Sequence, residues 1–108
     1  MSDEMIPGVQ RTAQLHVYGF RTPKYRPRPW LRLRVVAAAY SLKDARKILA
    51  REGFDRPKQS YQVDDTEAAS LAIQNAGCLV WQSLDDWGTN DQSWQVGGRD
   101  AIEAVFGN

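Results

Sequence analysis

Three segments of the chain carry the start and stop signals of helices, and these signals limit the fold more than any other feature. In each, a side chain that can cap a helix N-terminus stands three residues before an acid, as in Ser41 with Asp44, Asp64 with Glu67, and Asp100 with Glu103. Each segment is followed by a glycine suited to the left-handed turn that ends a helix: Gly53, Gly77 and Gly107. The pattern predicts helices over about 42–52, 65–76 and 101–106.

Alternation of apolar and polar residues predicts two strands before the first helix. In AQLHVYGF, Leu15 and Val17 share one face, and the opposite face carries His16, Tyr18 and Phe20. In WLRLRVVAAAY, one face carries Leu31, Leu33 and Val35, and the other carries Trp30, Arg32 and Arg34. The stretch 22–29 contains three prolines, which do not fit inside a central strand, so we expect it to be a stiff basic loop between the two strands.

Two further strands are expected at 60–63 and 78–84, and a weaker one at 93–97. The resulting order is β-β-α-β-α-β-β-α, which predicts an α+β fold with three capped helices packed on a small mixed sheet. Residues 1–108 are expected to form a single domain, with 1–10 as a flexible or loosely docked N-terminus. The predicted core consists of Leu15, Val17, Leu31, Leu33, Val35, Leu42, Ala45, Ile48, Leu49, Leu71, Ala72, Leu79, Val80, Trp81, Ile102 and Val105.

The composition is that of a globular domain without a membrane span, since no apolar run approaches the ~20 residues that a span needs. The acidic start MSDEMIPG lacks the order of a signal peptide, and the lone Cys78 has no partner for an internal disulfide. These observations predict a soluble protein of the reducing cytoplasm.

The net charge of +1 conceals two halves of opposite sign. Between positions 11 and 59 the chain has thirteen basic and three acidic side chains, whereas between 60 and 108 it has one basic and eight acidic side chains. Such asymmetry predicts a surface for an acidic partner, or attraction between the two halves, either within one chain or between copies in a homo-oligomer.

The basic residues suggest a binding surface. On the first predicted helix they form one stripe, and others lie on the preceding loop and strand; the candidate set is Arg26, Arg28, Arg32, Arg34, Lys43, Arg46, Lys47 and Arg51. Such a cluster can neutralise phosphates and release counterions. A solvated helix face whose arginine stems cover apolar surface is the simpler interpretation.

Aromatic residues beside these arginines suggest base stacking by Tyr18, Phe20 and Trp30. The same face could instead be covered by a helix, which would place these aromatic residues in the core.

Catalytic and metal sites are not expected. His16 is the only histidine and Cys78 the only cysteine, and Cys78 is expected to be a small buried hydrophobic residue. The pair Asp85 and Asp86 lacks the spacing of a calcium loop. We therefore expect no enzyme activity, no cofactor and no metal.

The passages RLRVVAAAYSLKDARKIL and LVWQSLDDW resemble small uncharacterised proteins of actinobacterial phages and their hosts. The strand–serine–helix passage also resembles the arm-binding modules of phage integrases, which read DNA with three strands, whereas only two predicted strands precede the helix here. The resemblance implies a phage-like context and no particular activity.

The favoured hypothesis is a non-enzymatic binding module that contacts the phosphates of nucleic acid through its basic surface. The alternative is a protein-binding modulator, such as a phage-type accessory or inhibitor protein, that docks on an acidic surface of a host protein. Both hypotheses require the same cations.

Overall fold

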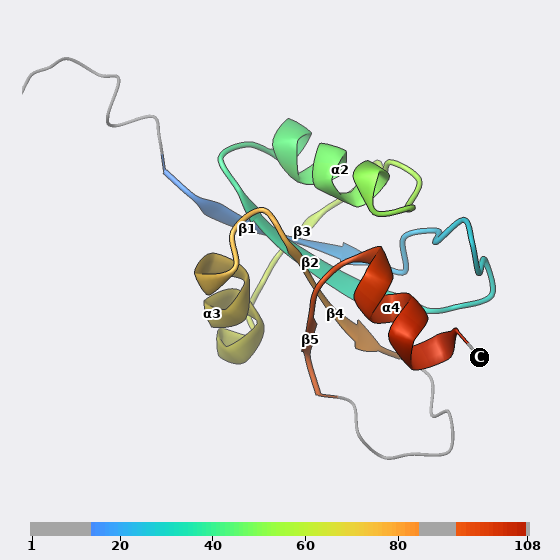
Figure 1. Cartoon of the computed structure of the whole chain (residues 1–108). Helices are drawn as coiled ribbons and strands as arrows, with labels where there is room; N and C mark the ends of the chain where they lie inside the picture. Colours follow the sequence, from blue (N-terminus) through green and yellow to red (C-terminus); the bar gives the residue numbers. More distant parts are fainter. Residues whose placement is uncertain (1–13, 85–92, 108) are drawn as a thin grey trace, which may run out of the picture.

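The computed structural model describes residues 14–84 and 93–107 (Figure 1). The elements along them are β1 (His16–Arg21), β2 (Leu33–Ala39), α2 (Leu42–Arg51), β3 (Tyr61–Gln62), α3 (Thr66–Gln74), β4 (Leu79–Ser83), β5 (Gln95–Val96) and α4 (Arg99–Phe106). The predicted α+β class and element order are confirmed. The expected flexible N-terminus, 1–10, and the pair Asp85 and Asp86 lie outside the described residues.

The strands form one sheet in the order β3-β1-β2-β4-β5, and every described neighbouring pair is antiparallel. The prediction of a mixed sheet is therefore wrong. The helix α2 connects β2 to β3, and both of these strands run opposite to β1. Because β1 lies between them, two strands of the same direction never become neighbours.

Helices cover both faces of the sheet (Figure 1). On one face, Phe20 and Val35 of the sheet share a buried cluster with Leu49 of α2 and Ile102 of α4. On the other face, α3 contributes to a second cluster that contains Val36, Ala38, Ala68, Ala72, Val80 and Trp94. Alternation along β2 thus separates two cores, which explains why a nearly continuous apolar run forms this central strand.

The start of α2 is as predicted, but the starts of the other two helices differ from the prediction. The Oγ of Ser41 accepts a hydrogen bond from the N–H of Asp44 at 3.1 Å. Asp65, not Asp64, caps α3, because its carboxylate accepts from the N–H of Ala68 at 3.0 Å.

Helix α4 begins at Arg99, without a side-chain cap from its own N-cap residue, Gly98. The Oε1 of Glu52 accepts from the N–H of Arg99 at 2.9 Å instead, so a distant acid replaces the predicted cap Asp100. Gly98 leaves room for this carboxylate, since a Cβ at this position would meet Glu52 Oε1.

The end of α2 contains the predicted glycine in the predicted conformation. Gly53 has φ +97°, its N–H donates to the carbonyl of Ala50, and the N–H of Phe54 donates to the carbonyl of Leu49. This pair of bonds is a Schellman motif, and it places Phe54 in the core beside Leu49. By contrast, Gly107 has a negative φ and does not form the predicted left-handed turn.

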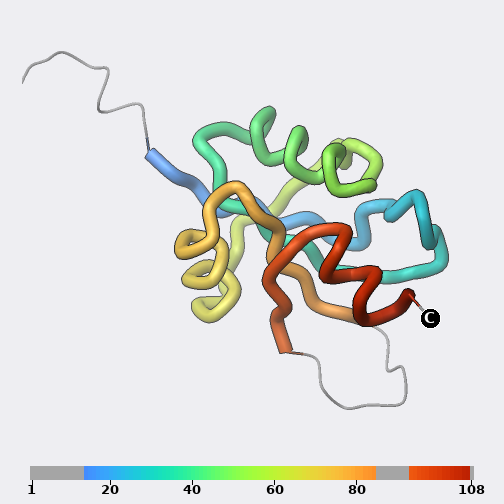
Figure 2. Tube along the Cα trace, viewed as in Figure 1, coloured from blue at the N-terminus to red at the C-terminus, as the bar shows by residue number. Residues whose placement is uncertain are grey.

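The predicted stiff loop between β1 and β2 packs against the chain that follows α2. In this loop, the N–H of Arg26 donates to the carbonyl of Gly53 at 2.9 Å, and the carbonyl of Lys24 accepts from the N–H of Asp55 at 2.9 Å. Figure 2 shows the loop lying between the C-terminal end of α2 and α4. The chain after α2 therefore anchors the proline-rich segment on both sides of Tyr25.

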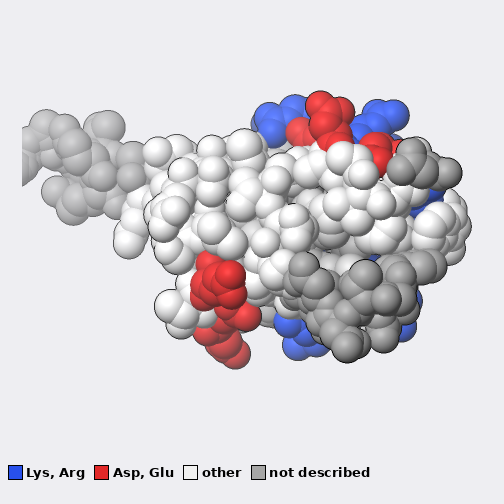
Figure 3. Space-filling model, turned by 60° about the horizontal axis from the view of Figure 1, so that its bottom comes forward, with Lys and Arg blue, Asp and Glu red and all other residues white. Residues whose placement is uncertain are grey.

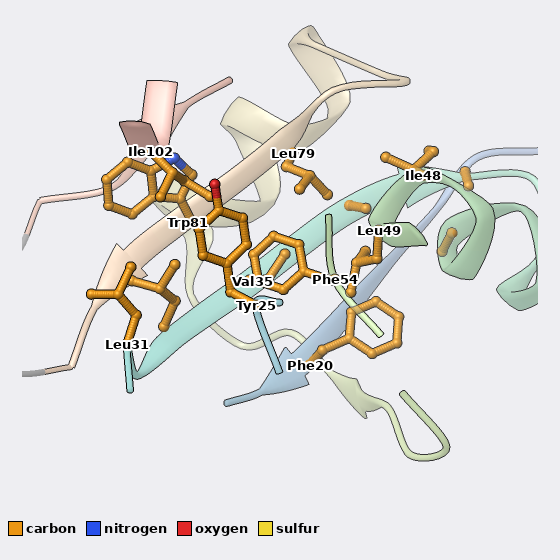
Figure 4. Packing of buried hydrophobic residues seen from close by; sticks show 14 residues of the cluster. Phe20, Tyr25, Leu31, Val35, Ile48, Leu49, Phe54, Leu79, Trp81 and Ile102 are labelled. Carbon is orange, nitrogen blue, oxygen red and sulfur yellow. The ribbon is translucent and has the colours of Figure 1, made fainter. Parts of the chain in front are cut away.

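Most of the predicted core is buried, but its centre includes aromatic residues that alternation missed. Tyr25 and Phe54 are fully buried with ring centroids 5.0 Å apart, and Figure 4 shows them close to Trp81 and Val35. The prediction for Val105 is wrong, since this side chain is 57% exposed on α4. Others of the predicted set are only half-buried: Leu15, Val17, Leu42 and Leu71.

Within the described residues, no helix has the length and apolar character needed to cross a membrane.

Candidate nucleic-acid interface

Helix α2 presents two exposed lysines on the side away from the core. Its inner side buries Ala45, Ile48 and Leu49 against the sheet, so Lys43 and Lys47, one turn apart, lie on the outer side. The helix periodicity therefore fixes both lysines at the surface.

Arg46, from the same helix, holds the following loop in place. Its Nε donates to the carbonyl of Pro57 at 2.9 Å, and its Nη2 donates to the carbonyl of Lys58 at 2.9 Å. The bonds bring Arg56 and Lys58 to the α2 side, where they border a hollow of about 400 Å³ together with Lys43. We call the set Lys43, Lys47, Arg56 and Lys58 the α2 basic surface.

Two other arginines of the predicted set contact the C-terminal end of α2. Arg26 pairs with Asp55 at 3.6 Å, and its Nη2 donates to the carbonyl of Ala50 at 3.4 Å. Arg51 pairs with Glu52 at 3.1 Å, and its Nη2 donates to the carbonyl of Gly77 at 2.8 Å. Both guanidinium groups thus neutralise acids or helix-end carbonyls of the chain itself.

Arg28 takes part in a cluster that joins the proline-rich loop to α4. Its Nη2 donates to Glu103 Oε1 at 2.8 Å and its Nε to Oε2 at 3.1 Å, while the hydroxyl of Tyr25 donates to Oε2 at 2.6 Å. Glu103 was predicted as a capping partner of Asp100, which is incorrect: its carboxylate accepts these long-range bonds instead. Among the described ion pairs, Arg28–Glu103 alone joins the basic and acidic halves of the chain.

These bonds shift the titration of the cluster. The hydrogen bonds from Arg28, and then from Tyr25, lower the pKa of Glu103 from 4.5 to about 2. Burial of the ring, and then the bond to Glu103, raise the pKa of Tyr25 well above its ordinary value. The cluster therefore holds Glu103 charged and Tyr25 neutral across the physiological range.

The shift of Glu103 predicts acid sensitivity. Since its folded pKa lies below its unfolded value, its contribution to stability is complete above pH 4.5 and is lost as the pH falls toward about 2. We expect the melting temperature of the wild-type protein to fall in this window. The Glu103→Gln variant should melt lower at neutral pH and show a smaller fall; parallel curves for the two proteins would contradict this assignment.

Arg32 and Arg34, the remaining arginines of the predicted set, are separate from the α2 basic surface. Arg32 is exposed just before β2, while Arg34 is half-buried and lies on the sheet face opposite α2, because its neighbour Val35 packs beneath that helix. The predicted set is therefore divided between different parts of the molecule. In the view of Figure 3, Lys and Arg side chains occur in separate groups, with Asp and Glu between some of them.

The three aromatic residues predicted to stack on bases are also divided. The register pairs Phe20 with Val35 and Tyr18 with Ala37, not with the face that carries Arg32 and Arg34. Phe20 is fully buried and Tyr18 half-buried against the same core, so neither forms an open stacking platform. Trp30 is 53% exposed in the loop before β2.

The potential metal ligands are dispersed. No group of three histidine, cysteine, aspartate or glutamate side chains that could hold a metal ion occurs within 14–84 and 93–107. Cys78 was expected to be buried at the start of a strand, but it is exposed one residue before β4.

Comparison with known proteins adds no relative: no family model, curated protein or solved structure matches the chain. The resemblance to small phage proteins stays a prediction.

Arg56 and Lys58 were not among the predicted binding residues, although both are basic and lie only a few residues after α2. The signal that could have found them is the helix-ending Gly53, which turns the chain back along α2. The carbonyl contacts of Arg46 depend on that return, and no local pattern specifies them.

Proposed function

We propose that the chain is a non-enzymatic nucleic-acid-binding module that contacts phosphates through the α2 basic surface. One observation carries the proposal: Lys43, Arg56 and Lys58 border a hollow beside α2, Lys47 is exposed one turn along the helix from Lys43, and none of the four takes part in the described ion pairs. By contrast, four arginines of the set predicted from the sequence bond to groups of the chain itself: Arg26, Arg28, Arg46 and Arg51.

The chemistry of the surface favours a polyanion. Lysine ammonium groups and an arginine contact phosphates without regard to base sequence, because phosphate contacts position a protein on nucleic acid and carry no direct sequence information. Each neutralised phosphate releases counterions and adds to affinity. The α2 basic surface therefore supports binding by charge and shape rather than by base readout.

Affinity for nucleic acid should depend steeply on salt. Four phosphate contacts predict that log K falls with log salt at a slope of about 2.8–3.6, since each contact contributes about 0.7–0.9. Fluorescence anisotropy with labelled single-stranded and duplex oligonucleotides across a salt series measures this slope, and poly-glutamate serves as the acidic non-nucleic competitor.

The competitor separates the two binding classes. If the protein shows no affinity for either oligonucleotide at about 50 mM salt, the nucleic-acid proposal is wrong. If poly-glutamate displaces the oligonucleotide at an equal concentration of charge, the surface recognises acidic polymers in general, as a protein-binding modulator would.

A further inference from the structure

The sheet face opposite α2 has one end that α3 does not cover. There α3 packs over Val17, Ala38 and Val80, whereas the other end of β1 and β2 borders a groove of about 560 Å³. Its lining includes Arg21, Arg34, Tyr61, Asp64, Asp65 and Trp94.

Two arginines stand side by side in this groove. Arg21 and Arg34 are direct partners in the β1–β2 register, so their side chains leave the same face with Cβ atoms about 4.5–5.5 Å apart. Like charges in this arrangement repel each other and destabilise the pair of strands. Neither guanidinium takes part in the described ion pairs, so an anion bound between them would relieve the repulsion.

Aromatic rings form the walls of the groove. The Tyr61 ring lies directly over Gly19, where a Cβ would approach its Cζ to 2.4 Å, so the glycine lets the ring lie against the sheet. The Arg21 guanidinium lies 5.0 Å from the centroid of that ring. Trp94 also lines the groove, where it is nearly buried and keeps only a small exposed area.

The two acids of the groove differ in what they can still bind. The carboxylate of Asp65 accepts from the N–H of Ala68 at 3.0 Å and from Trp94 Nε1 at 3.2 Å, and these bonds lower its pKa. Asp64 is exposed beside it. The groove thus offers two guanidinium donors at the sheet and one carboxylate acceptor, Asp64, at the turn before α3.

We propose that this groove binds a nucleoside 5′-monophosphate, with its phosphate between Arg21 and Arg34 and its base against the aromatic wall. Two arginine forks match the oxygens of a phosphate, a volume of several hundred Å³ suits a ligand of this size, and Asp64 accepts a hydrogen bond from an exocyclic amino group of the base. The ligand can be a free nucleotide or the phosphorylated end of a strand. Because the groove and the α2 basic surface lie on opposite faces of the sheet, the two sites are independent.

Isothermal titration calorimetry with 5′-AMP, adenosine, inorganic phosphate and a 5′-phosphorylated oligonucleotide tests the proposal. We expect 5′-AMP to bind more tightly than adenosine or phosphate alone, and 5′-UMP, which lacks an exocyclic amino group, to bind more weakly. Arg34→Gln should weaken the binding of 5′-AMP by about tenfold or more, as the loss of a charge-assisted hydrogen bond predicts. Gly19→Ala, which displaces the Tyr61 ring, should also weaken it.

The control is Lys24→Gln, which removes one exposed charge outside both the groove and the α2 basic surface and should leave the affinity for 5′-AMP unchanged. The NMR signal of the Trp94 indole N–H reports whether each variant retains the wall of the groove. If free 5′-AMP does not bind, the groove is assigned to strand ends when the phosphorylated oligonucleotide binds more tightly than the same strand without its phosphate and Arg34→Gln removes that difference. The proposal is overturned if adenosine binds as well as 5′-AMP, if Arg34→Gln changes nothing, or if none of these ligands binds.

Discussion

Replacing Tyr25 with alanine is expected to lower the free energy of unfolding by about 3–5 kcal/mol, the usual cost of deleting a large buried aromatic side chain. The ring is fully buried against Phe54, and its hydroxyl is one of the two donors to Glu103. Its removal therefore leaves a cavity in the core and removes one of the two side chains that bond the proline-rich loop to Glu103 of α4. Urea denaturation followed by circular dichroism measures the change.

Tyr25→Phe provides the matched control because it keeps the ring and removes only the hydroxyl bond to Glu103. We expect a smaller loss of stability for this variant, while Arg28 still holds the carboxylate. If Tyr25→Ala cost less than about 1 kcal/mol, the loop would not be part of the core as described.

Neutralising the α2 basic surface is the second change with a large expected effect. The combined substitutions Lys43→Gln, Lys47→Gln, Arg56→Gln and Lys58→Gln should remove most of the salt-dependent affinity for nucleic acid, and the slope should fall by about 0.7–0.9 for each lost phosphate contact. Stability should change little, since exposed charges of this kind contribute about 0–1 kcal/mol each. Anisotropy titrations and thermal melting of the same preparations measure both effects.

An unchanged slope in this variant would mean that other cations carry the binding. A large fall in melting temperature would instead mean that the four residues are structural, which would also contradict the division proposed between free and internally bonded cations.

The local parts of the fold could be predicted from the sequence because their signals are local. Ser41, the apolar side of α2 and the turn at Gly53 all act within a few residues, and the structure agrees with each of them. The antiparallel sheet could not be predicted in this way. The element order permits β3 to pair on either side of the hairpin, and no local pattern specifies its place beside β1.

The incorrect predictions share one physical cause, which is contact between distant segments. Asp100 and Glu103 have the spacing of a capping pair, yet Glu52 caps α4 and Glu103 bonds to Tyr25 and Arg28. Tyr25 stands in a stretch of prolines and basic residues, where alternation gives no indication of burial.

The candidate site shows the same limit. The periodicity of α2 predicted that Lys43 and Lys47 would lie on its outer side. The periodicity did not predict which arginines bond to carbonyl groups. Arg46 donates to the carbonyls of Pro57 and Lys58, and these bonds depend on how the loop after α2 folds back along the helix.

The central claim, that the free cations on α2 bind nucleic acid while the bonded arginines hold the fold, is tested most directly by two variants of equal charge. Lys43→Gln with Lys58→Gln removes two cations of the α2 basic surface, and Arg28→Gln with Arg51→Gln removes two that bond within the chain. The affinity of each variant for a duplex oligonucleotide is measured at about 100 mM salt. The Debye length there is about 10 Å, so screening limits the effect of distant charges. The account predicts that the lysine variant loses affinity and keeps its melting temperature, while the arginine variant keeps its affinity and melts lower. Equal losses of affinity in the two variants would contradict it.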